Sequence, residues 1–303
     1  MTEPEARIRV LWNGNAGSKG GLPTNRTGEE ELRALTARYL PGAEFVATGS
    51  EDEAIAAADS AREAGYAAVI AAGGDGSVGL VATRLLGSPT ALGILPLGSV
   101  MNVARMLGIP RKLEQAFEII TAGHTRRIDV GSVNDEPFFE TASVGMNAAI
   151  FSEVQRADEG DYGGILRAIG VAFRYRPARM RLTLDDGEIS TRALVVTISN
   201  GPYTGIGFTV APHARLDDGR FDVTLFRYYS KLDLIRHFMS IRAGRRSYSP
   251  HTTTYRSKHV RIGAARPLPA RADGRELGTT PIEMSIKPGV LTVLAPADQA
   301  HQD

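Results

Sequence analysis

The sequence lacks cysteine, long apolar runs and any recognisable targeting segment. Its 303 residues include no cysteine, which excludes disulfide bonds, thiolate catalysis and cysteine-ligated zinc. Its uncharged stretches, such as residues 64–74, contain glycines and fall short of the ~20 apolar residues that cross a membrane. Residues 1–9 are polar, with no long apolar stretch behind them. We therefore expect a soluble, cytoplasmic protein that would meet a lipid only from the membrane surface.

Net charge is also nearly absent. Lysine and arginine number 35, aspartate and glutamate 34, and the formal net charge is +1 at pH 7. Nucleic-acid-binding chains normally show a basic excess, so no nucleic acid partner is expected. One segment departs from this balance, because residues 234–272 contain nine arginines and lysines and no acid. Basic residues near an anionic bilayer contribute about 1 kcal/mol each, which predicts that this segment contacts anionic membrane. The alternative is that these are solvated arginines on the faces of strands.

The first 129 residues alternate strand-like apolar runs with helix-like stretches. Thr27 with Glu30 and Ser50 with Glu53 have the form of capping boxes, and Gly65 is expected to end a helix. The expected strands cover residues 8–12, 44–48, 67–71 and 91–95. The expected helices cover residues 29–39, 51–64, 75–86, 99–107 and 111–121. This alternation predicts an α/β domain, a parallel sheet with helices on both faces.

From about Asp129 strand-like runs follow one another directly, with turns such as Asp185–Gly187 and Asp217–Gly219 between them. The expected strands cover residues 126–133, 138–144, 180–184, 193–199, 221–226, 259–262, 281–286 and 290–294. Helical stretches interrupt near residues 150–174 and 231–244. We expect a second domain that is a mostly antiparallel β-sandwich. The expected domains are residues 1–129 and 130–303, and the last residues are candidates to return to the first domain.

A glycine-rich turn joins a strand to a helix at residues 74–79, which match the pattern G-x-G-x-x-G. A dinucleotide fold would need an acid about 20 residues later, but no Asp or Glu lies between Asp75 and Glu114. The turn remains suited to phosphate, because its backbone N–H groups can close on an anion at a helix N-terminus. Asp75 would repel phosphate unless it serves a metal, a water or a substrate hydroxyl. The alternative is that Asp75 caps a helix.

Two further turns follow strands of the same expected sheet. Residues 13–21 are glycine-rich and carry Lys19, and residues 95–99 end in Ser99 at a helix start. The carboxyl ends of parallel strands share one edge, where ligands bind in open α/β sheets. No G-x-x-x-x-G-K-[ST] loop is present. The three turns therefore predict a phosphate site that is not of the Walker type.

Together these segments resemble the diacylglycerol kinase catalytic domain family, the bacterial diacylglycerol kinase-like lipid kinases that are related to sphingosine kinases. The resemblance covers nearly the whole chain in order. The segments similar to the family pattern are Asn13–Gly17, Gly73–Ser77, Leu92–Ser99, Ala104–Pro110, Ser199–Gly205, Ala211–Gly219, Asp273–Glu276 and Pro288–Leu291.

The resemblance implies an ATP- and Mg²⁺-dependent lipid kinase, which transfers the γ-phosphoryl group to a lipid hydroxyl such as that of diacylglycerol. It implies Mg²⁺ at the Asp218 side chain and the backbone carbonyls of Arg215 and Arg220. It places the general base in the closing segment, at Asp273 or Glu276, and we keep Asp75 as a third catalytic candidate. The implied nucleotide-binding residues are Asn13, Gly14, Asn15, Ala16, Gly17, Thr48, Gly73, Gly74, Asp75, Gly76, Ser77 and Ser99.

Three departures from the family pattern leave alternatives open. Gly79–Leu80 replaces an Asn-Glu pair, Met101–Asn102 stands where an acid is usual, and Arg275 separates Asp273–Gly274 from Glu276. One alternative is a degenerate member that binds nucleotide or lipid without catalysis. Another is an NAD kinase-like phosphotransferase, since that group shares the G-G-D-G loop. The expected partners are a lipid substrate, an anionic membrane surface and, as a homodimer, a second copy of the chain.

Overall fold

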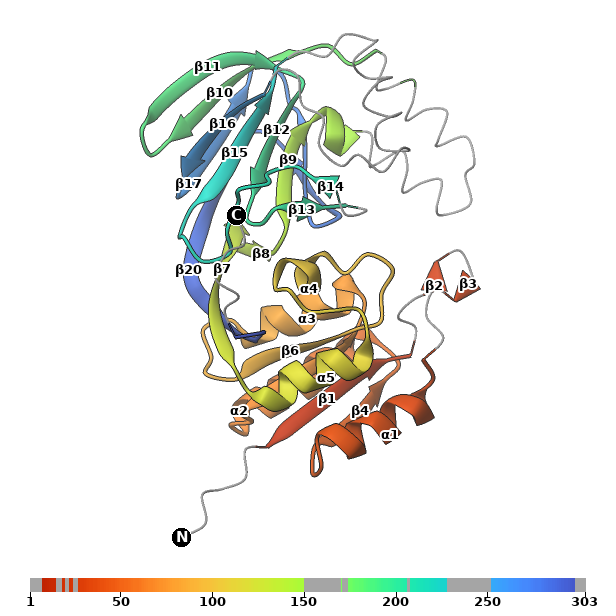
Figure 1. Cartoon of the computed structure of the whole chain (residues 1–303). Helices are drawn as coiled ribbons and strands as arrows, with labels where there is room; N and C mark the ends of the chain where they lie inside the picture. Colours follow the sequence, from red (N-terminus) through yellow and green to blue (C-terminus); the bar gives the residue numbers. More distant parts are fainter. Residues whose placement is uncertain are drawn as a thin grey trace. The chain divides into compact units, whose positions relative to one another are not determined.

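The computed structural model describes residues 7–14, 18–19, 22–23, 27–149, 170, 174–205, 208–227 and 252–297. The chain forms two compact units (Figure 1). Unit 1 comprises residues 1–129 with 288–303, and unit 2 comprises residues 130–287. The expected helical stretches 150–174 and 231–244 lie almost wholly outside the described residues. In the described part of the chain, no helix combines the length and apolarity needed to cross a membrane.

Unit 1 confirms the parallel sheet covered by helices on both faces. The strand order is β4 (Glu44–Thr48), β1 (Ile8–Asn13), β5 (Ala68–Gly73) and β6 (Ala91–Pro96). Helices α1 (Glu29–Tyr39) and α5 (Leu113–Ala122) pack together against the sheet, and so do α2 (Glu51–Glu63) and α3 (Asp75–Leu85). The connection from β1 to β4 runs along the sheet in the opposite direction to the connections that reach β5 and β6. Because such connections are right-handed, the two helix pairs lie on opposite faces. Figure 1 shows this arrangement.

The local signals in unit 1 explain where its helices begin and end. The Ser50 hydroxyl accepts the N–H of Glu53 at 3.2 Å, so the cap forms, while the Glu53 carboxylate accepts the N–H of Gly49, one residue before the cap, at 2.7 Å. The expected capping box of Thr27 with Glu30 is wrong by one residue, because α1 begins after Gly28 and no side chain caps this helix. Gly65 follows α2 with a φ of +68°, a conformation that suits glycine.

A short helix, α4 (Asn102–Met106), is smaller than the expected helix 99–107. Met101 precedes it with a φ of +57°, in the left-handed region, and a right-handed helix cannot run through such a residue. Two short ladders complete the described elements. They are β2 (Ser18–Lys19) with β3 (Leu22–Pro23) in unit 1, and β13 (Tyr203–Thr204) with β14 (Phe208–Thr209) in unit 2.

Unit 2 consists of two antiparallel sheets. Sheet 1 has the order β11 (Gly187–Ala193), β10 (Ala178–Leu184), β17 (His259–Ala264) and β20 (Ile282–Leu294), with β7 (Thr125–Val133) and β8 (Glu136–Phe138) added beside β20. Sheet 2 has the order β16 (Thr252–Ser257), β15 (Phe221–Phe226), β12 (Val195–Ser199), β9 (Thr141–Gly145), β18 (Pro269–Ala272) and β19 (Arg275–Thr279). Strands β7 and β20 also carry the chain between the two units.

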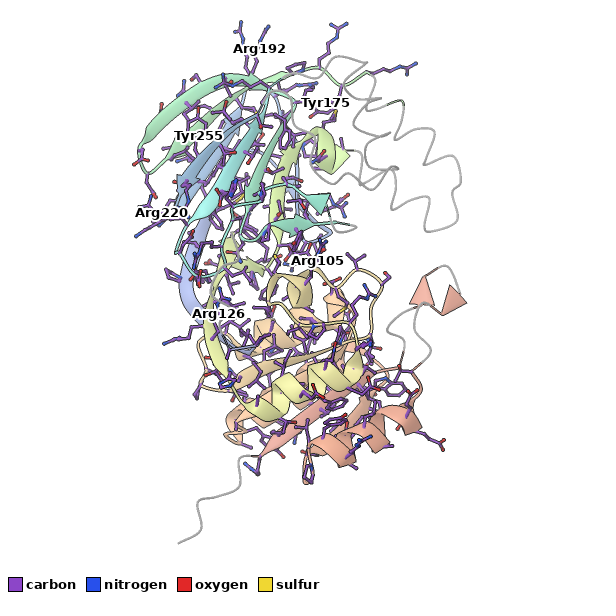
Figure 2. The ribbon with its side chains drawn as sticks, viewed as in Figure 1. Arg105, Arg126, Tyr175, Arg192, Arg220 and Tyr255 are labelled. Carbon is purple, nitrogen blue, oxygen red and sulfur yellow. The ribbon has the colours of Figure 1, made fainter. Side chains whose placement is uncertain are left out.

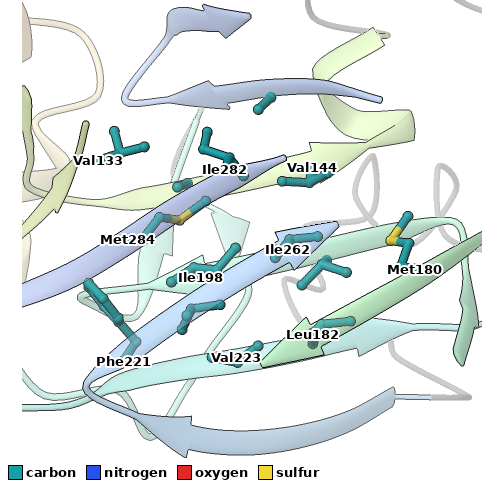
Figure 3. Close-up of a cluster of buried hydrophobic side chains, with 14 of the residues drawn as sticks. Val133, Val144, Met180, Leu182, Ile198, Phe221, Val223, Ile262, Ile282 and Met284 are labelled. Carbon is teal, nitrogen blue, oxygen red and sulfur yellow. The ribbon is translucent and has the colours of Figure 1, made fainter. Parts of the chain in front are cut away.

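One apolar core lies between the two sheets (Figure 3). Along β10 the residues alternate between buried and exposed, so Met180 and Leu182 point into the core while Arg179 and Arg181 point away. Phe138 of sheet 1 stacks on Phe221 of sheet 2, with ring centroids 5.5 Å apart. These contacts confirm the sandwich that the sequence predicts.

The sequence did not predict six strands of unit 2, namely β11, β13, β14, β16, β18 and β19. The strands that it did predict differ most from the structure in two places. The expected strand 138–144 is broken into β8 and β9, because the N–H groups of Phe139 and Glu140 bond to the Asp273 side chain instead of to a neighbouring strand. The expected strands 281–286 and 290–294 are one strand, β20, which continues through Gly289 with a φ of +53°. The basic segment 234–272 contributes β16, β17 and β18 in its described part, and Arg256, Arg261 and Arg271 each pair with an acid.

Candidate active site

A cavity of about 250 Å³ lies in unit 1 where the strand order reverses. The chain leaves β1 toward one side of the sheet and leaves β5 toward the other, which opens a crevice at the carboxyl ends of these strands. The lining residues are Leu11, Asn13, Thr48, Ser50, Glu51, Ala54, Ala71, Gly74, Gly76, Ser77, Leu80 and Val81. Five of the expected nucleotide-binding residues are among them.

Polar contacts fix three of these residues. The Asn13 amide donates to the Ser77 hydroxyl at 3.0 Å, which ties the end of β1 to the first turn of α3. The Thr48 hydroxyl donates to the Trp12 carbonyl at 3.1 Å, which ties β4 to β1. No side chain caps α3 at Gly74, so its leading N–H groups keep their capacity to bind an anion. The cavity therefore combines fixed polar side chains with a helix N-terminus.

The glycine turns after β5 and β6 touch each other through their backbones. A Cβ placed on Gly98 would lie 2.7 Å from the Cα of Gly74 and 2.8 Å from the sulfur of Met101. The Arg111 guanidinium donates to the carbonyls of Gly98 at 2.7 Å and Ser99 at 2.8 Å. Only glycine fits at position 98, and this contact sets the position of the α3 N-terminus.

Asp75 joins the same two turns. Its carboxylate accepts the backbone N–H of Met101 at 2.8 Å, just before α4. Burial raises the pKa of Asp75 above its ordinary value, while the amide donors around Met101 and the Arg111 guanidinium oppose this shift. Asp75 therefore caps a helix, as the alternative from the sequence has it, but the helix is α4 and not α3. Its carboxylate does not line the described cavity.

The remaining nucleotide candidates are placed less centrally. Asn15, Ala16 and Gly17 lie outside the described residues. Gly14 is exposed at the end of β1, and Ser99 is exposed beside Arg111. Gly73 ends β5, and its buried carbonyl accepts the N–H of Leu97 at 3.0 Å.

Asp273 occupies the tip of the β18–β19 hairpin in unit 2. Asp273 and Gly274 have φ values of +44° and +81°, which are typical of a two-residue hairpin turn. The Asp273 carboxylate accepts three consecutive backbone N–H groups, from Phe139, from Glu140 at 2.9 Å and from Thr141 at 3.2 Å. Burial raises the pKa of Asp273, in opposition to these donors. This clamp is also what separates β8 from β9.

Glu276 lies nearby in sequence but in different surroundings. Its side chain is 64% exposed and pairs with Arg271 at 3.3 Å. Arg271 is itself buried, and desolvation lowers the pKa of its guanidinium. Glu276 therefore balances a buried cation across the hairpin. Three backbone N–H groups hold the Asp273 carboxylate, whereas the ion pair of Glu276 is to a side chain.

The Asp217–Asp218 turn precedes β15 and is already occupied by cationic side chains. The Asp218 carboxylate accepts the N–H of Arg220 at 3.0 Å and forms an ion pair with Arg256 of β16. Asp217 pairs with Arg215 at 3.1 Å. Among the residues that the structure describes, no cluster of three or more His, Cys, Asp or Glu could hold a metal. The Asp218 carboxylate and the carbonyls of Arg215 and Arg220 are oxygens of the kind that Mg²⁺ prefers, but the carboxylate pairs with the Arg256 guanidinium, which competes with a metal at this turn.

This ion pair makes a prediction about metal dependence. We expect Mg²⁺ without nucleotide to leave the melting temperature of the wild-type protein unchanged. Arg256→Gln should free the Asp218 carboxylate, so Mg²⁺ should then raise the melting temperature. Asp218→Asn should cost about 1 kcal/mol or less, as a partly exposed pair does, equally with Mg²⁺ and with EDTA. Thermal melts of the three proteins test this, and a wild type that Mg²⁺ stabilises would contradict it.

Sequence reasoning missed two buried acids near these turns. Glu140, 8% exposed, accepts the N–H groups of Asn200 and Gly201 at its backbone carbonyl beside the Asp273 clamp. Asp222 is 5% exposed in β15, opposite Ser199, and burial raises its pKa. Each follows or precedes an apolar residue in a strand-like run, so no local signal distinguishes it.

Two family models match this chain. Residues 7–133 match the model described as the diacylglycerol kinase catalytic domain. Residues 141–295 match the model described as the YegS C-terminal NAD kinase beta sandwich-like domain. The two matches together cover both units.

Curated relatives and solved structures extend this similarity. A protein named probable lipid kinase YegS-like from Chromohalobacter salexigens is 31% identical over 280 residues, 89% of this chain and 90% of that protein. One of the same name from Pseudomonas aeruginosa is 29% identical over 285 residues, 91% and 93% of the two chains. The crystal structure of a diacylglycerol kinase from Bacillus anthracis covers 97% of this chain and 98% of its own, with a TM-score of 0.70 at 18% identity. At that identity the structure shows a shared fold.

Proposed function

Because the chain belongs to the diacylglycerol kinase catalytic domain family, whose relatives are named probable lipid kinases, we propose that it transfers the γ-phosphoryl group of ATP to a lipid hydroxyl. The observation that carries the proposal is the cavity of unit 1. It lies at the switch point of the sheet and is lined by Asn13, Thr48 and Ser77 beside the uncapped start of α3. A site of that construction suits the phosphates of a nucleotide.

Each group has a role in this proposal. The N–H groups at the start of α3 and the Ser77 hydroxyl bind phosphate oxygens, and the Asn13 amide orients that hydroxyl. Asp75 positions the turn before α4 and acts through Met101. Mg²⁺ carried on the ATP phosphates offsets the charge that develops during transfer.

The proton of the acceptor hydroxyl goes to Asp273 in this proposal. A general base works best when its pKa is raised toward the working pH, and burial raises that of Asp273. The three amide donors fix the direction of its carboxylate. Glu276 is assigned to Arg271 instead.

The cavity gives a direct prediction for ATP binding. Ser77→Leu should fill part of the cavity and remove the hydrogen bond from Asn13, so ATP affinity should fall about tenfold or more. Thr83→Leu is the matched control, because Thr83 lies later in α3, is similarly half-buried and does not line the cavity. Calorimetric titration with ATP measures both. Equal affinities in the two variants would place the nucleotide elsewhere.

The reaction itself is tested with γ-labelled ATP, Mg²⁺ and a panel of acceptors. The panel should contain diacylglycerol, monoacylglycerol, a sphingoid base and NAD, because the second family model is described as NAD kinase-like. We expect label in a lipid. Label in NAD would favour the NAD kinase-like alternative, and ATP binding without transfer to any acceptor would favour a non-catalytic member.

A further inference from the structure

Three arginines share the outer face of sheet 1. Arg179 and Arg181 alternate with core residues along β10, so both point away from the core. Arg192 of β11 lies directly opposite Arg179 in the antiparallel register, and Arg181 lies opposite Gly263 of β17. All three side chains are exposed. Figure 2 shows Arg192 where β11 ends, directed away from the sheet.

These arginines border an open hollow of about 840 Å³ in unit 2. The described lining adds Ser190 and Thr191 of β11 and the small residues Gly263, Ala264 and Ala265. Gly263, opposite Arg181, has no side chain, and a Cβ there would meet nothing within 4 Å, so a group larger than water can approach the guanidinium groups. The N–H of Ala265, just after β17, is bonded to the Arg179 carbonyl at 3.3 Å. We call this set, Arg179, Arg181 and Arg192, the arginine face.

The arginine face does not stabilise the sheet. Like charges that lie directly opposite on neighbouring strands, about 5 Å apart, repel each other, and Arg179 faces Arg192 in this way. Within the described residues, no ion pair reaches any of the three arginines. By contrast, Arg261 of β17, in the same sheet, pairs with Glu283 at 3.2 Å. The acids of the β10–β11 hairpin, Asp185, Asp186 and Glu188, gather at its opposite end.

We propose that the arginine face docks the protein on an anionic phospholipid bilayer. Guanidinium groups bind phosphate oxygens in a bidentate manner, and an array of them on one exposed face matches the charge of a phosphate-bearing surface. The choice of a bilayer rests on the proposed lipid kinase function, because the acceptor lipid resides there. Arg179, Arg181 and Arg192 lie outside the basic segment 234–272, three of whose described arginines pair with acids.

The test is co-sedimentation of the full chain, without ATP, with two kinds of vesicle. One contains phosphatidylcholine alone, and the other phosphatidylcholine with phosphatidylglycerol. The variant is Arg179→Gln/Arg181→Gln/Arg192→Gln. The control removes the same charge through Arg38→Gln/Lys112→Gln/Lys287→Gln, three exposed cations on other elements. Circular dichroism melts confirm that both variants fold.

We expect the wild type to bind phosphatidylglycerol vesicles and to release them at high salt, since exposed charges are screened. The triple arginine variant should bind about 100-fold more weakly, about fivefold for each arginine, and the control should bind as the wild type does. Activity on lipid in neutral detergent micelles should survive in the triple arginine variant. These two measurements separate docking from catalysis. A wild type that binds vesicles but phosphorylates no lipid would contradict the proposed function and leave the docking proposal standing.

Three results would overturn the proposal. They are wild-type binding that ignores vesicle charge, a triple arginine variant that binds as tightly as the control, and a wild type that leaves vesicles alone but retards duplex DNA in a gel. The last would assign the arginine face to nucleic acid.

Discussion

Replacing Gly98 with alanine is expected to reduce turnover about 100-fold, although it adds a single methyl group. The new Cβ would lie 2.7 Å from the Gly74 Cα, a backbone atom that cannot rotate away. The two glycine turns must then separate, and the start of α3 moves with Gly74. A displacement of about 1 Å in a positioning element can cost about 100-fold in rate. Overpacking should also lower stability by about 1–3 kcal/mol.

Steady-state kinetics against ATP and a urea melt together measure this effect. Gly28→Ala is the control, because a Cβ at Gly28 meets nothing within 4 Å and the residue precedes α1, outside the cavity lining. We expect the Gly98→Ala loss to appear in ATP affinity as well as in turnover. A folded Gly98→Ala protein with wild-type kinetics would show that the contact between the turns does not position the nucleotide.

Asp273→Asn is expected to lower turnover at least 100-fold, whereas Glu276→Gln should stay within a few-fold of the wild type. Positioned bases contribute typically about 10²–10⁴-fold. Asparagine tolerates the left-handed backbone of position 273, so the hairpin turn itself can persist. Its NH₂ group cannot accept the N–H groups that the carboxylate accepts, so some loss of stability is expected as well. ATP affinity should be retained, because Asp273 does not line the cavity.

The pH profile separates a base from a structural clamp. A base must be deprotonated, and burial raises the pKa of Asp273 above that of an ordinary carboxyl. Turnover should therefore be high above the raised pKa and should decline as the pH falls through it. Glu276→Gln should keep this acid limb unchanged. If the limb shifts in Glu276→Gln instead, or if Asp273→Asn loses only stability, the base has been assigned to the wrong residue.

The sequence predicts the elements of unit 1 well because their signals are local. A strand, a glycine turn and a helix start follow one another within a few residues, and Ser50 with Glu53 shows this most simply. The nucleotide candidates Asn13, Thr48 and Ser77 gather at one cavity because parallel strands end on the same edge. Topology thus converts local motifs into a common site.

What the sequence could not predict are the contacts made over long distances along the chain. Asp75 binds the N–H of Met101, Asp218 pairs with Arg256, and Asp273 clamps the backbone of residues 139–141. Each partner is chosen by the fold and not by its neighbours in sequence. For the same reason, the sequence predicts one strand over residues 138–144, although the Asp273 carboxylate binds the backbone within it. Likewise, nothing near Arg256 in the sequence indicates that it pairs with Asp218, in the turn expected to bind metal.

The path of β20 has a consequence for how this protein can be made and divided. Its last residues pair with β6 through Val293 and Leu92, so unit 1 completes its sheet only with residues from the far end of the chain. A fragment that stops at residue 129 would leave β6 as an edge strand with unpaired backbone groups, a template for aggregation. During synthesis the first unit must wait for the ribosome to finish nearly the whole chain. Unit 2 is in effect an insertion, and its sheet 1 needs β20 as well, so the same late strand completes the sheets of both units.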